Sequence, residues 1–287
     1  MSPHVASLAE QLVSHVSQFE NCLVAYSGGV DSAVVAKAAQ LALGEQAVAV
    51  TGVSASLAAG ELEAAQRIAA QIGIRHEVLS TDELGNPEYL QNAPDRCFHC
   101  KTELYDQLQR MGAARGIRTI LNGANADDLS DFRPGTKAAS QHAVRSPLAE
   151  CGFTKATVRL IAQHWGIEAW DKPATPCLSS RVAYGLSITP ERLARIDAAE
   201  RLLRSLGFNT VRVRLHENEL ARLEVPLDAL SRLMDPPTRD TVIRELRRLG
   251  FRYVTLDLEG FRSGSFKQLI PAETLTAFSA AGAGRLA

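Results

Sequence analysis

The chain has 287 residues and a formal net charge of -1, from 31 Lys and Arg against 32 Asp and Glu. This balance argues against the strongly basic surface of nucleic-acid-binding proteins and favours a small-molecule substrate. With 46% hydrophobic and 22% charged residues, the composition excludes a disordered chain. The length suggests one α/β domain with a smaller second domain.

The sequence also indicates where the protein is located and what its cysteines do. No apolar run reaches the roughly 18 residues of a membrane-spanning helix, and the N-terminus lacks a basic segment followed by an apolar core. We therefore expect a cytoplasmic protein that does not bind membranes. The five cysteines are an odd number, and such a chain has little need of disulfides. Their chemistry is expected to be metal binding or catalysis.

The first two thirds of the chain alternate short apolar runs with helical patterns, which is typical of a doubly wound parallel sheet. The expected strands cover residues 22–26, 47–53, 75–79 and 119–122. The expected helices cover residues 32–43, 57–72, 99–111 and 154–165, with stop signals at Gly44, Gly73 and Gly166. An α/β fold is predicted for this part.

After Trp170, the sequence KPATPCLSSRVAYGLS interrupts the alternation with Pro, Ser and Gly and predicts an ordered loop between domains. We place the two domains at residues 1–186 and 187–287. The second opens with a helix that has Thr189 as N-cap, Pro190 at its first position and Gly207 at its end. The strand TVRVRLH, a helix over 237–249 and the strand YVTLDL follow, so this domain is predicted to be α+β.

A glycine-rich turn joins the first strand to the following helix through Ser27, Gly28, Gly29, Val30, Asp31 and Ser32. The glycines let backbone N–H groups approach phosphate oxygens, the helix dipole adds positive potential, and the serines can donate hydroxyl hydrogen bonds. A carboxylate beside a triphosphate is repulsive unless it holds Mg²⁺, which is the role expected of Asp31. The Gly-Lys-Ser/Thr of a Walker loop does not follow.

These six residues resemble the PP-loop of the ATP-pyrophosphatase superfamily. The resemblance implies that ATP is cleaved between its α- and β-phosphates, that AMP passes to a substrate oxygen and that pyrophosphate leaves. Downstream, NGANADD follows the fourth strand, where open α/β sheets bind ligands. Asn125 and Asp127 are candidates for the nucleotide site, and Asp127 with Asp128 for holding Mg²⁺ or the substrate. A plain Asn-, Gly- and Asp-rich turn is the alternative.

Cys97 and Cys100 stand three residues apart in DRCFHCK, close enough to share one metal ion or cluster. Together with Cys177 in PCLSSR, they could hold three irons of a [4Fe–4S] cluster and leave the fourth iron open to bind sulfide. Zinc, with His99 as a fourth ligand, is the first competitor, and a redox dithiol or unrelated buried cysteines come next. Two cysteines are expected to be structural: Cys22 and Cys151.

Four elements in order, SGGVDS, NGANADD, PCLSSR and RVR, resemble the LarE family over nearly the whole chain. These ATP-dependent sulfur transferases make the nickel-pincer nucleotide cofactor of lactate racemase. The resemblance implies that a carboxylate of pyridinium-3,5-biscarboxylic acid mononucleotide is adenylated and becomes a thiocarboxylate. It also implies a homo-oligomer such as a hexamer, and catalytic roles for Cys177, Ser180, Arg181 and Asp31.

The family lines its substrate-phosphate site with residues that correspond here to Glu200, Arg212 and Arg214. Arginines two residues apart on a strand project to the same face, and two guanidinium groups suit a phosphate monoester. The second domain would thus bind the substrate and mediate oligomerisation. The alternative is a solvated strand face with Glu200 on an exposed helix.

In the best-known family members a single cysteine gives up its own sulfur, and each protein turns over once. The additional Cys97 and Cys100 make this chain similar to the branch that carries an iron–sulfur cluster. We therefore expect all three cysteines to survive the reaction as ligands, with sulfide from a source that the sequence does not name. Zinc and a sacrificial Cys177 are the alternatives.

The runner-up function is a tRNA thiolase, because PP-loop enzymes with a CxxC pair and a later cysteine also modify RNA. It predicts a basic patch, for which five arginines are candidates: Arg195, Arg201, Arg204, Arg212 and Arg214. Ammonia-dependent amide synthesis, as in NAD synthetases, is another alternative, but it would not explain the three cysteines. Three apolar side chains in LDALSRLM are expected to be exposed and to allow self-association: Leu230, Leu233 and Met234.

Overall fold

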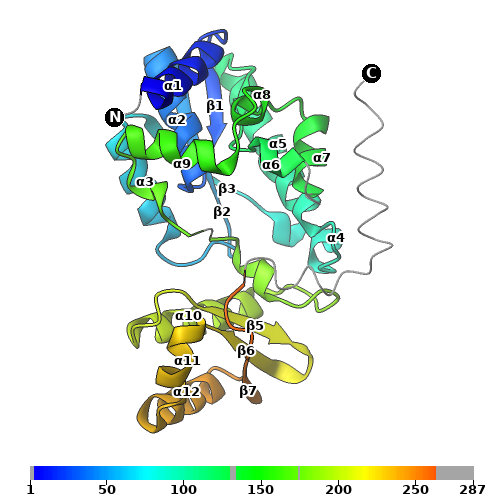
Figure 1. Ribbon diagram of the computed structural model, residues 1–287. Helices are drawn as coiled ribbons and strands as arrows, with labels where there is room; N and C mark the ends of the chain where they lie inside the picture. Colours follow the sequence, from blue (N-terminus) through cyan, green and yellow to red (C-terminus); the bar gives the residue numbers. More distant parts are fainter. Residues whose placement is uncertain (1–2, 130–133, 174, 263–287) are drawn as a thin grey trace.

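A computed structural model describes residues 3–129, 134–173 and 175–262. The first of its two sheets is parallel, with the strand order β3-β2-β1-β4. Figure 1 labels β1, β2 and β3 of this sheet. The strands are β1 (Cys22–Ala25), β2 (Ala47–Val53), β3 (Arg75–Ser80) and β4 (Ile120–Leu121). All four predicted strands are present, and only the fourth is much shorter than expected.

Helices cover both faces of this sheet. The longer ones are α1 (Pro3–Val16), α2 (Val30–Leu43), α3 (Glu61–Ile72), α5 (Arg96–Arg115) and α9 (Lys155–His164). The shorter ones are α4 (Pro87–Leu90), α6 (Ala126–Leu129), α7 (Pro134–Gln141) and α8 (Pro147–Glu150). In β1, Cys22 and Val24 pack with α1, α2, α3 and α9, whereas Leu23 packs with α5 and α7. The predicted doubly wound α/β fold is confirmed.

Glycines end the helices at the predicted places. Gly44 and Gly73 are the C-caps of α2 and α3, and Gly166 follows α9 with a φ of 66°. Short 3-10 segments add to these elements: η1 (Gly44–Gln46), η2 (Glu83–Gly85), η3 (Glu168–Trp170), η4 (Leu178–Arg181), η5 (Glu217–Glu219) and η6 (Leu227–Ala229).

The second sheet has the strand order β5-β6-β7. β5 (Arg212–His216) pairs antiparallel with β6 (Leu220–Glu224), which pairs parallel with β7 (Tyr253–Leu256). The sequence did not predict β6, because it is short and its charged Arg222 and Glu224 interrupt the apolar pattern. Asn218 and Glu219, both with a φ of 57°, form the turn that leads into it. This part of the chain is α+β, as predicted.

Three helices accompany this sheet: α10 (Pro190–Ser205), α11 (Leu230–Met234) and α12 (Pro236–Arg248). Thr189 caps α10, because its hydroxyl accepts the N–H of Arg192 at 3.3 Å, as the sequence predicted. The expectation that the whole apolar stretch of α11 is exposed is wrong. Leu233 is 4% exposed and belongs to the core beside the second sheet, whereas Met234 is 52% exposed.

The second sheet lies beyond the carboxyl ends of the strands of the first (Figure 1). The Leu178 N–H donates to the carbonyl of Ser56, which follows β2, at 2.8 Å. The N–H of Ala59 donates to the Asp197 carboxylate of α10 at 3.1 Å. Residues 177–181 therefore pass between the phosphate-loop sheet and the second sheet. None of the helices in the described part of the chain combines the length and the apolar character needed to cross a membrane.

Candidate active site

The glycine-rich turn lies between β1 and α2, and its conformation requires glycine. Gly28 has a φ of 70°, and a Cβ there would lie 2.8 Å from the Cα of Ala65. Gly29 is the N-cap of α2. The Ser32 hydroxyl donates to the carbonyl of Gly29 at 3.0 Å and accepts the N–H of Ser27 at 3.2 Å. The turn thus ends at a helix N-terminus, whose backbone N–H groups suit phosphate.

Asp31, on the first turn of α2, has two partners from distant segments. Its Oδ1 accepts a hydrogen bond from Asn125 at 3.2 Å, and its Oδ2 forms a short ion pair with the ammonium of Lys155. The sequence did not identify Lys155 as a site residue. Its position was the only clue, since a helix dipole disfavours a cation at the first residue of α9. The structure therefore adds a cation to the predicted phosphate site.

The NGANADD loop packs against the same turn. A Cβ at Gly123 would lie 2.7 Å from a backbone nitrogen of α2, so the approach requires glycine. The carboxylate of Asp127 accepts the N–H of Lys155 at 2.9 Å. Asp128 is 8% exposed and accepts the N–H of Asn125 at 3.2 Å, which stabilises the loop from inside. Asn125 and Asp127 are thus brought beside Asp31.

The three cysteines of the predicted cluster lie on two segments. Cys97 and Cys100 lie near the start of α5, and Cys177 immediately precedes η4. Cys97 is exposed, and the other two are partly buried. Burial, followed by the charges of Cys177 and Glu83, raises the pKa of the Cys100 thiol. The charge of Cys177 therefore acts on Cys100 although 77 positions separate them in the sequence.

Two cations lie beside these cysteines. Burial alone would lower the pKa of Lys101, but Tyr105 and then the charges of all three cysteines raise it. Arg96 is 5% exposed, and the charges of Cys97 and Cys177 raise its pKa in the same way against burial. Lys101 therefore lies near all three thiols, and Arg96 lies near those of Cys97 and Cys177.

An iron–sulfur cluster bound by thiolates carries negative charge, which nearby cations offset, so the donor set fits such a cluster in its chemistry. Within residues 3–129, 134–173 and 175–262, no three His, Cys, Asp or Glu side chains are arranged to hold a metal ion. His99 instead contacts the carboxylates of Glu88 and Asp95 at 3.2 and 3.6 Å, which disfavours it as a zinc ligand. The three cysteines therefore match an iron–sulfur cluster in the type of ligand atom, but their side chains are not arranged around one point.

The remaining cysteines have structural surroundings, as predicted. Cys22 is fully buried in the core of the first sheet, and this burial raises its pKa to about 12. Cys151 is partly buried against the same core. A thiol kept protonated in apolar surroundings is unreactive, which fits the structural role expected of Cys22.

Arg181 is fully buried and ties the Cys177 loop to α10. Its Nε and Nη2 donate to the two carboxylate oxygens of Glu200 at 3.0 and 3.3 Å. Its Nη1 donates to the carbonyl of Cys177 and to the Ser180 hydroxyl, both at 3.0 Å. That hydroxyl donates to the same carbonyl at 2.7 Å. Arg181 and Ser180 therefore hold the backbone at Cys177 in place.

Glu200 is completely buried, so the alternative that it lies on an exposed helix face is wrong. Besides Arg181, it accepts hydrogen bonds from Arg204 at 2.7 Å and from the N–H of Val213 in β5 at 3.2 Å. One carboxylate thus joins the Cys177 loop, α10 and β5.

Arg212 and Arg214 are 6% and 5% exposed, so the alternative of a solvated strand face is wrong as well. Arg214 donates to Glu224 at 2.9 Å and to the carbonyl of Ser180 at 2.8 Å. Burial, followed by the charge of Arg181, lowers the pKa of Arg212 to about 10. A guanidinium whose charged form is disfavoured by burial and by other cations would be stabilised by an anion. Arg212 and Arg214 therefore lie side by side on the second sheet, and Arg214 contacts the Cys177 loop directly.

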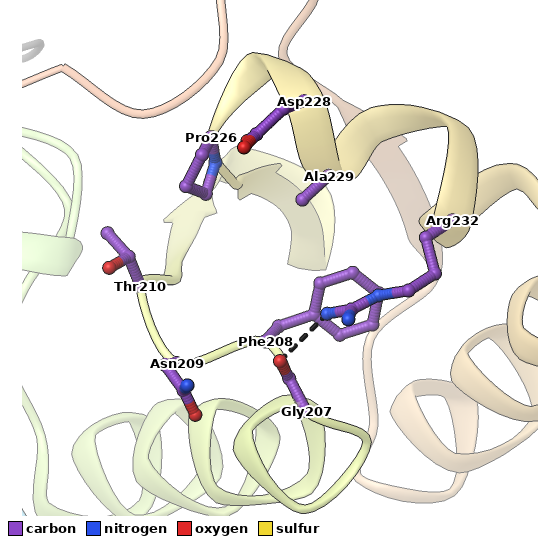
Figure 2. Close-up of a pocket in the computed structure, with 8 residues that line it drawn as sticks. All are labelled: Gly207, Phe208, Asn209, Thr210, Pro226, Asp228, Ala229 and Arg232. Carbon is purple, nitrogen blue, oxygen red and sulfur yellow. Dashed lines mark hydrogen bonds between the residues drawn. The ribbon is translucent and has the colours of Figure 1, made fainter.

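A separate open pocket lies at the end of α10 (Figure 2). Its lining residues are Gly207, Phe208, Asn209, Thr210, Pro226, Asp228, Ala229 and Arg232. The guanidinium of Arg232 stacks on the Phe208 ring, 4.2 Å from its centroid, and donates to the carbonyl of Gly207 at 2.7 Å. No residue predicted for the active site lines this pocket, so we do not assign substrate binding to it.

A glycine turn of this geometry on a doubly wound parallel sheet defines the class of PP-loop enzymes that use ATP. Residues 4–107 match the NAD synthase family, which belongs to this class. A protein of Lactiplantibacillus plantarum, pyridinium-3,5-bisthiocarboxylic acid mononucleotide synthase, is 38% identical over 276 residues, 96% of this chain and 99% of the relative. The chain therefore belongs to the LarE family, as its motifs predicted.

Two further relatives cover most of the chain. An uncharacterized protein of Synechocystis is 47% identical over 264 residues, 92% of this chain and 98% of the relative. An uncharacterized protein of Methanocaldococcus jannaschii is 27% identical over 243 residues, 84% of this chain and 90% of the relative. The similarity to the Synechocystis protein is long enough to include both sheets and the Cys177 loop between them.

Proposed function

We propose that this enzyme uses ATP to adenylate a carboxylate of pyridinium-3,5-biscarboxylic acid mononucleotide and converts it to a thiocarboxylate. The observation that carries the proposal is the hydrogen bond from Arg214 to the carbonyl of Ser180. It joins the strand of Arg212 and Arg214 to the loop of Cys177, so a substrate phosphate bound by these arginines would hold the rest of the substrate near a thiol. The similarity to the named synthase supports the same substrate.

Adenylation is assigned to the phosphate loop. The N–H groups of residues 27–32 would bind the phosphates of ATP, and Asp31 would hold Mg²⁺ with the help of Asn125 and Asp127. Asp31 would release Lys155 on holding Mg²⁺, and the ammonium of Lys155 would then be available to the phosphates. A carboxylate oxygen of the substrate attacks the α-phosphorus, the bond to the bridging oxygen breaks, and pyrophosphate leaves.

Substrate binding is assigned to Arg212 and Arg214, which would pair with the phosphate of the mononucleotide. Glu200 belongs to this site in a different way. Its carboxylate would repel a phosphate, and it is already bound to Arg181 and Arg204. We therefore assign Glu200, Ser180 and Arg181 to positioning the Cys177 loop and the arginines.

Sulfur transfer is assigned to Cys97, Cys100 and Cys177, which would hold a [4Fe–4S] cluster as three thiolate ligands. When bound, such a cluster would supply an open iron that carries sulfide. Sulfide adds to the carbonyl carbon of the acyl adenylate, the bond from that carbon to the AMP oxygen breaks, and AMP leaves. The positive charge of Arg96 and Lys101 supports the placement of an anionic sulfur species here.

We further propose that residues 1–186 bind ATP and that residues 187–287 bind the substrate phosphate and form a homo-oligomer such as a hexamer. The two separate sheets support this division. Leu227 and Met234, which are 63% and 52% exposed, supply apolar surface for association.

The experiment is ATP–pyrophosphate exchange, with the biscarboxylated mononucleotide compared with the nucleoside that lacks its phosphate. We expect exchange to depend on the mononucleotide and to fall at least about tenfold with the nucleoside or with Arg214→Met. Exchange that ignores the phosphate would contradict the assignment of Arg212 and Arg214.

A tRNA thiolase is less well supported. Three of the five arginines considered for an RNA-binding patch form ion pairs: Arg195 with Glu219, Arg201 with Asp197 and Arg204 with Glu200. The other two, Arg212 and Arg214, are buried and cannot form a surface for RNA.

A further inference from the structure

Glu83 is a buried carboxylate that the reaction proposed above does not use. It lies in η2, shortly after β3, and is 2% exposed. Its Oε1 accepts hydrogen bonds from the hydroxyls of Ser54 and Ser56, the latter at 2.8 Å. Its Oε2 is buried and has no hydrogen-bond partner among the described residues. Such an oxygen costs free energy, which points to a function other than stability.

The two serines connect Glu83 to the cysteine loop. The Ser54 hydroxyl lies 2.9 Å from that of Ser56 and accepts the Ser56 N–H at 3.1 Å, so both serines form one compact turn after β2. The carbonyl of Ser56 then accepts the N–H of Leu178 at 2.8 Å. Leu178 follows Cys177 directly. A continuous chain of hydrogen bonds therefore runs from Glu83 to the peptide next to the Cys177 thiol.

Other contacts hold the loop further along. The hydroxyl of Tyr89 lies 2.6 Å from that of Ser179, and Arg96 donates to the carbonyl of Ser179 at 2.9 Å. Burial, followed by the charges of Cys177, Cys100 and Glu83, raises the pKa of Tyr89, which places Glu83 in the same neighbourhood. Tyr89 and Arg96 thus hold Ser179, whereas the Ser56 carbonyl holds Leu178, which is next to Cys177 in the sequence.

We propose that Glu83 is a positioning residue for the sulfur-transfer step. Through Ser54 and Ser56 it fixes the carbonyl that anchors Leu178, and so it sets where Cys177 stands relative to the acyl adenylate. This inference rests on the proposed function. Among the described residues, no hydrogen bond or ion pair joins Glu83 to the phosphate loop, so adenylation is not expected to depend on it, whereas a small displacement of the Cys177 loop slows the transfer of sulfur.

The test follows both half-reactions in the full-length enzyme. Adenylation is measured as substrate-dependent ATP–pyrophosphate exchange, and transfer as thiocarboxylate formed in the presence of sulfide. We expect Glu83→Ala to lower transfer at least about tenfold and to keep exchange within about twofold. Glu83→Gln keeps an acceptor oxygen for the serines and is expected to restore most of the transfer. Ser54→Ala combined with Ser56→Ala is expected to resemble Glu83→Ala, and adding these changes to Glu83→Ala to cost little more.

Asp82→Ala is the matched control, because Asp82 precedes Glu83 in the same segment but is exposed. It is expected to change neither half-reaction. A merely structural role of Glu83 predicts that exchange, transfer and Tm fall together, and this outcome would overturn the proposal. So would unchanged transfer in Glu83→Ala. If the unaltered enzyme forms no thiocarboxylate while it catalyses exchange, the proposed function itself fails, which is a different result.

Discussion

In the proposed adenylation step, the ion pair between Lys155 and Asp31 would have to rearrange when Mg²⁺ and ATP bind, because the metal and the ammonium would compete for one carboxylate. Lys155→Ala is expected to raise the KM for ATP about tenfold, since one cation is lost from the phosphate site. ATP–pyrophosphate exchange measures this change. Lys172→Ala, which removes a similar ion pair with Glu61, is the control and is expected to leave KM within about twofold. Equal values of KM for ATP in the two variants would show that Lys155 does not contribute to binding of ATP.

The pair between Arg181 and Glu200 is completely buried, so its loss leaves a carboxylate with one partner fewer in a region without solvent. Arg181→Met is expected to lower the free energy of unfolding by about 3 kcal/mol. Urea denaturation measures this loss. The exposed pair of Arg239 with Asp240 provides the comparison, since Arg239→Ala should cost less than about 1 kcal/mol. A small effect at Arg181 would show that this pair does not hold the Cys177 loop.

Among single residues of the site, the sequence predicted those that belong to a motif. It did not predict those whose role depends on partners far away in the sequence. Asp31 and Cys177 stand in recognisable patterns. Lys155 pairs with a residue 124 positions away, and Glu83 reaches the Cys177 loop through Ser54 and Ser56. Local patterns carry no information on such partners, so the cation at the phosphate loop and the buried carboxylate could be found only in the folded chain.

Among the structural elements, the turn before α2 depends most strictly on its residues. Gly28→Ala meets both an unfavourable φ of 70° and a contact of 2.8 Å with the backbone of α3. Gly44→Ala is the matched control, because Gly44 also has a positive φ but has no neighbouring atom within 4 Å of a Cβ. We expect a loss of about 1 kcal/mol for Gly44→Ala and clearly more for Gly28→Ala, measured by urea denaturation.

Gly28→Ala is also expected to abolish binding of ATP, measured by titration calorimetry, whereas Gly44→Ala binds it normally. Equal losses of stability in the two variants, or normal binding of ATP to Gly28→Ala, would show that the turn adapts to a side chain and would contradict the tight packing seen against α3.

Elements with strong patterns were predicted well. β2 has the predicted bounds, and α10 begins and ends at its predicted punctuation. The prediction did not include β6, because two of its five residues are charged and its buried Glu224 is neutralised by arginines from the tertiary structure. A strand whose charged residues are paired inside the fold does not show the apolar alternation by which strands are identified.

The whole molecule places three cysteines from two segments near two cations, and this arrangement underlies the proposed cluster. Anaerobic preparations are expected to contain about four irons per chain and to lose them in Cys97→Ala, Cys100→Ala and Cys177→Ala. Cys151→Ala, outside this neighbourhood, should keep them. Iron and sulfide assays with absorption spectra measure this outcome. A colourless protein with zinc or no metal would instead favour Cys177 as a sacrificial sulfur donor.

The most direct test of ATP-driven sulfur transfer measures how many product molecules form per enzyme chain. Under anaerobic conditions, the enzyme is given ATP, Mg²⁺, sulfide and the biscarboxylated mononucleotide, and mass spectrometry follows the replacement of one oxygen by one sulfur. We predict one AMP per thiocarboxylate, several products per chain and an unchanged mass of the protein. Formation of AMP without thiocarboxylate would contradict sulfur transfer. A single product per chain, with loss of the sulfur of Cys177, would contradict repeated turnover by the same enzyme molecule.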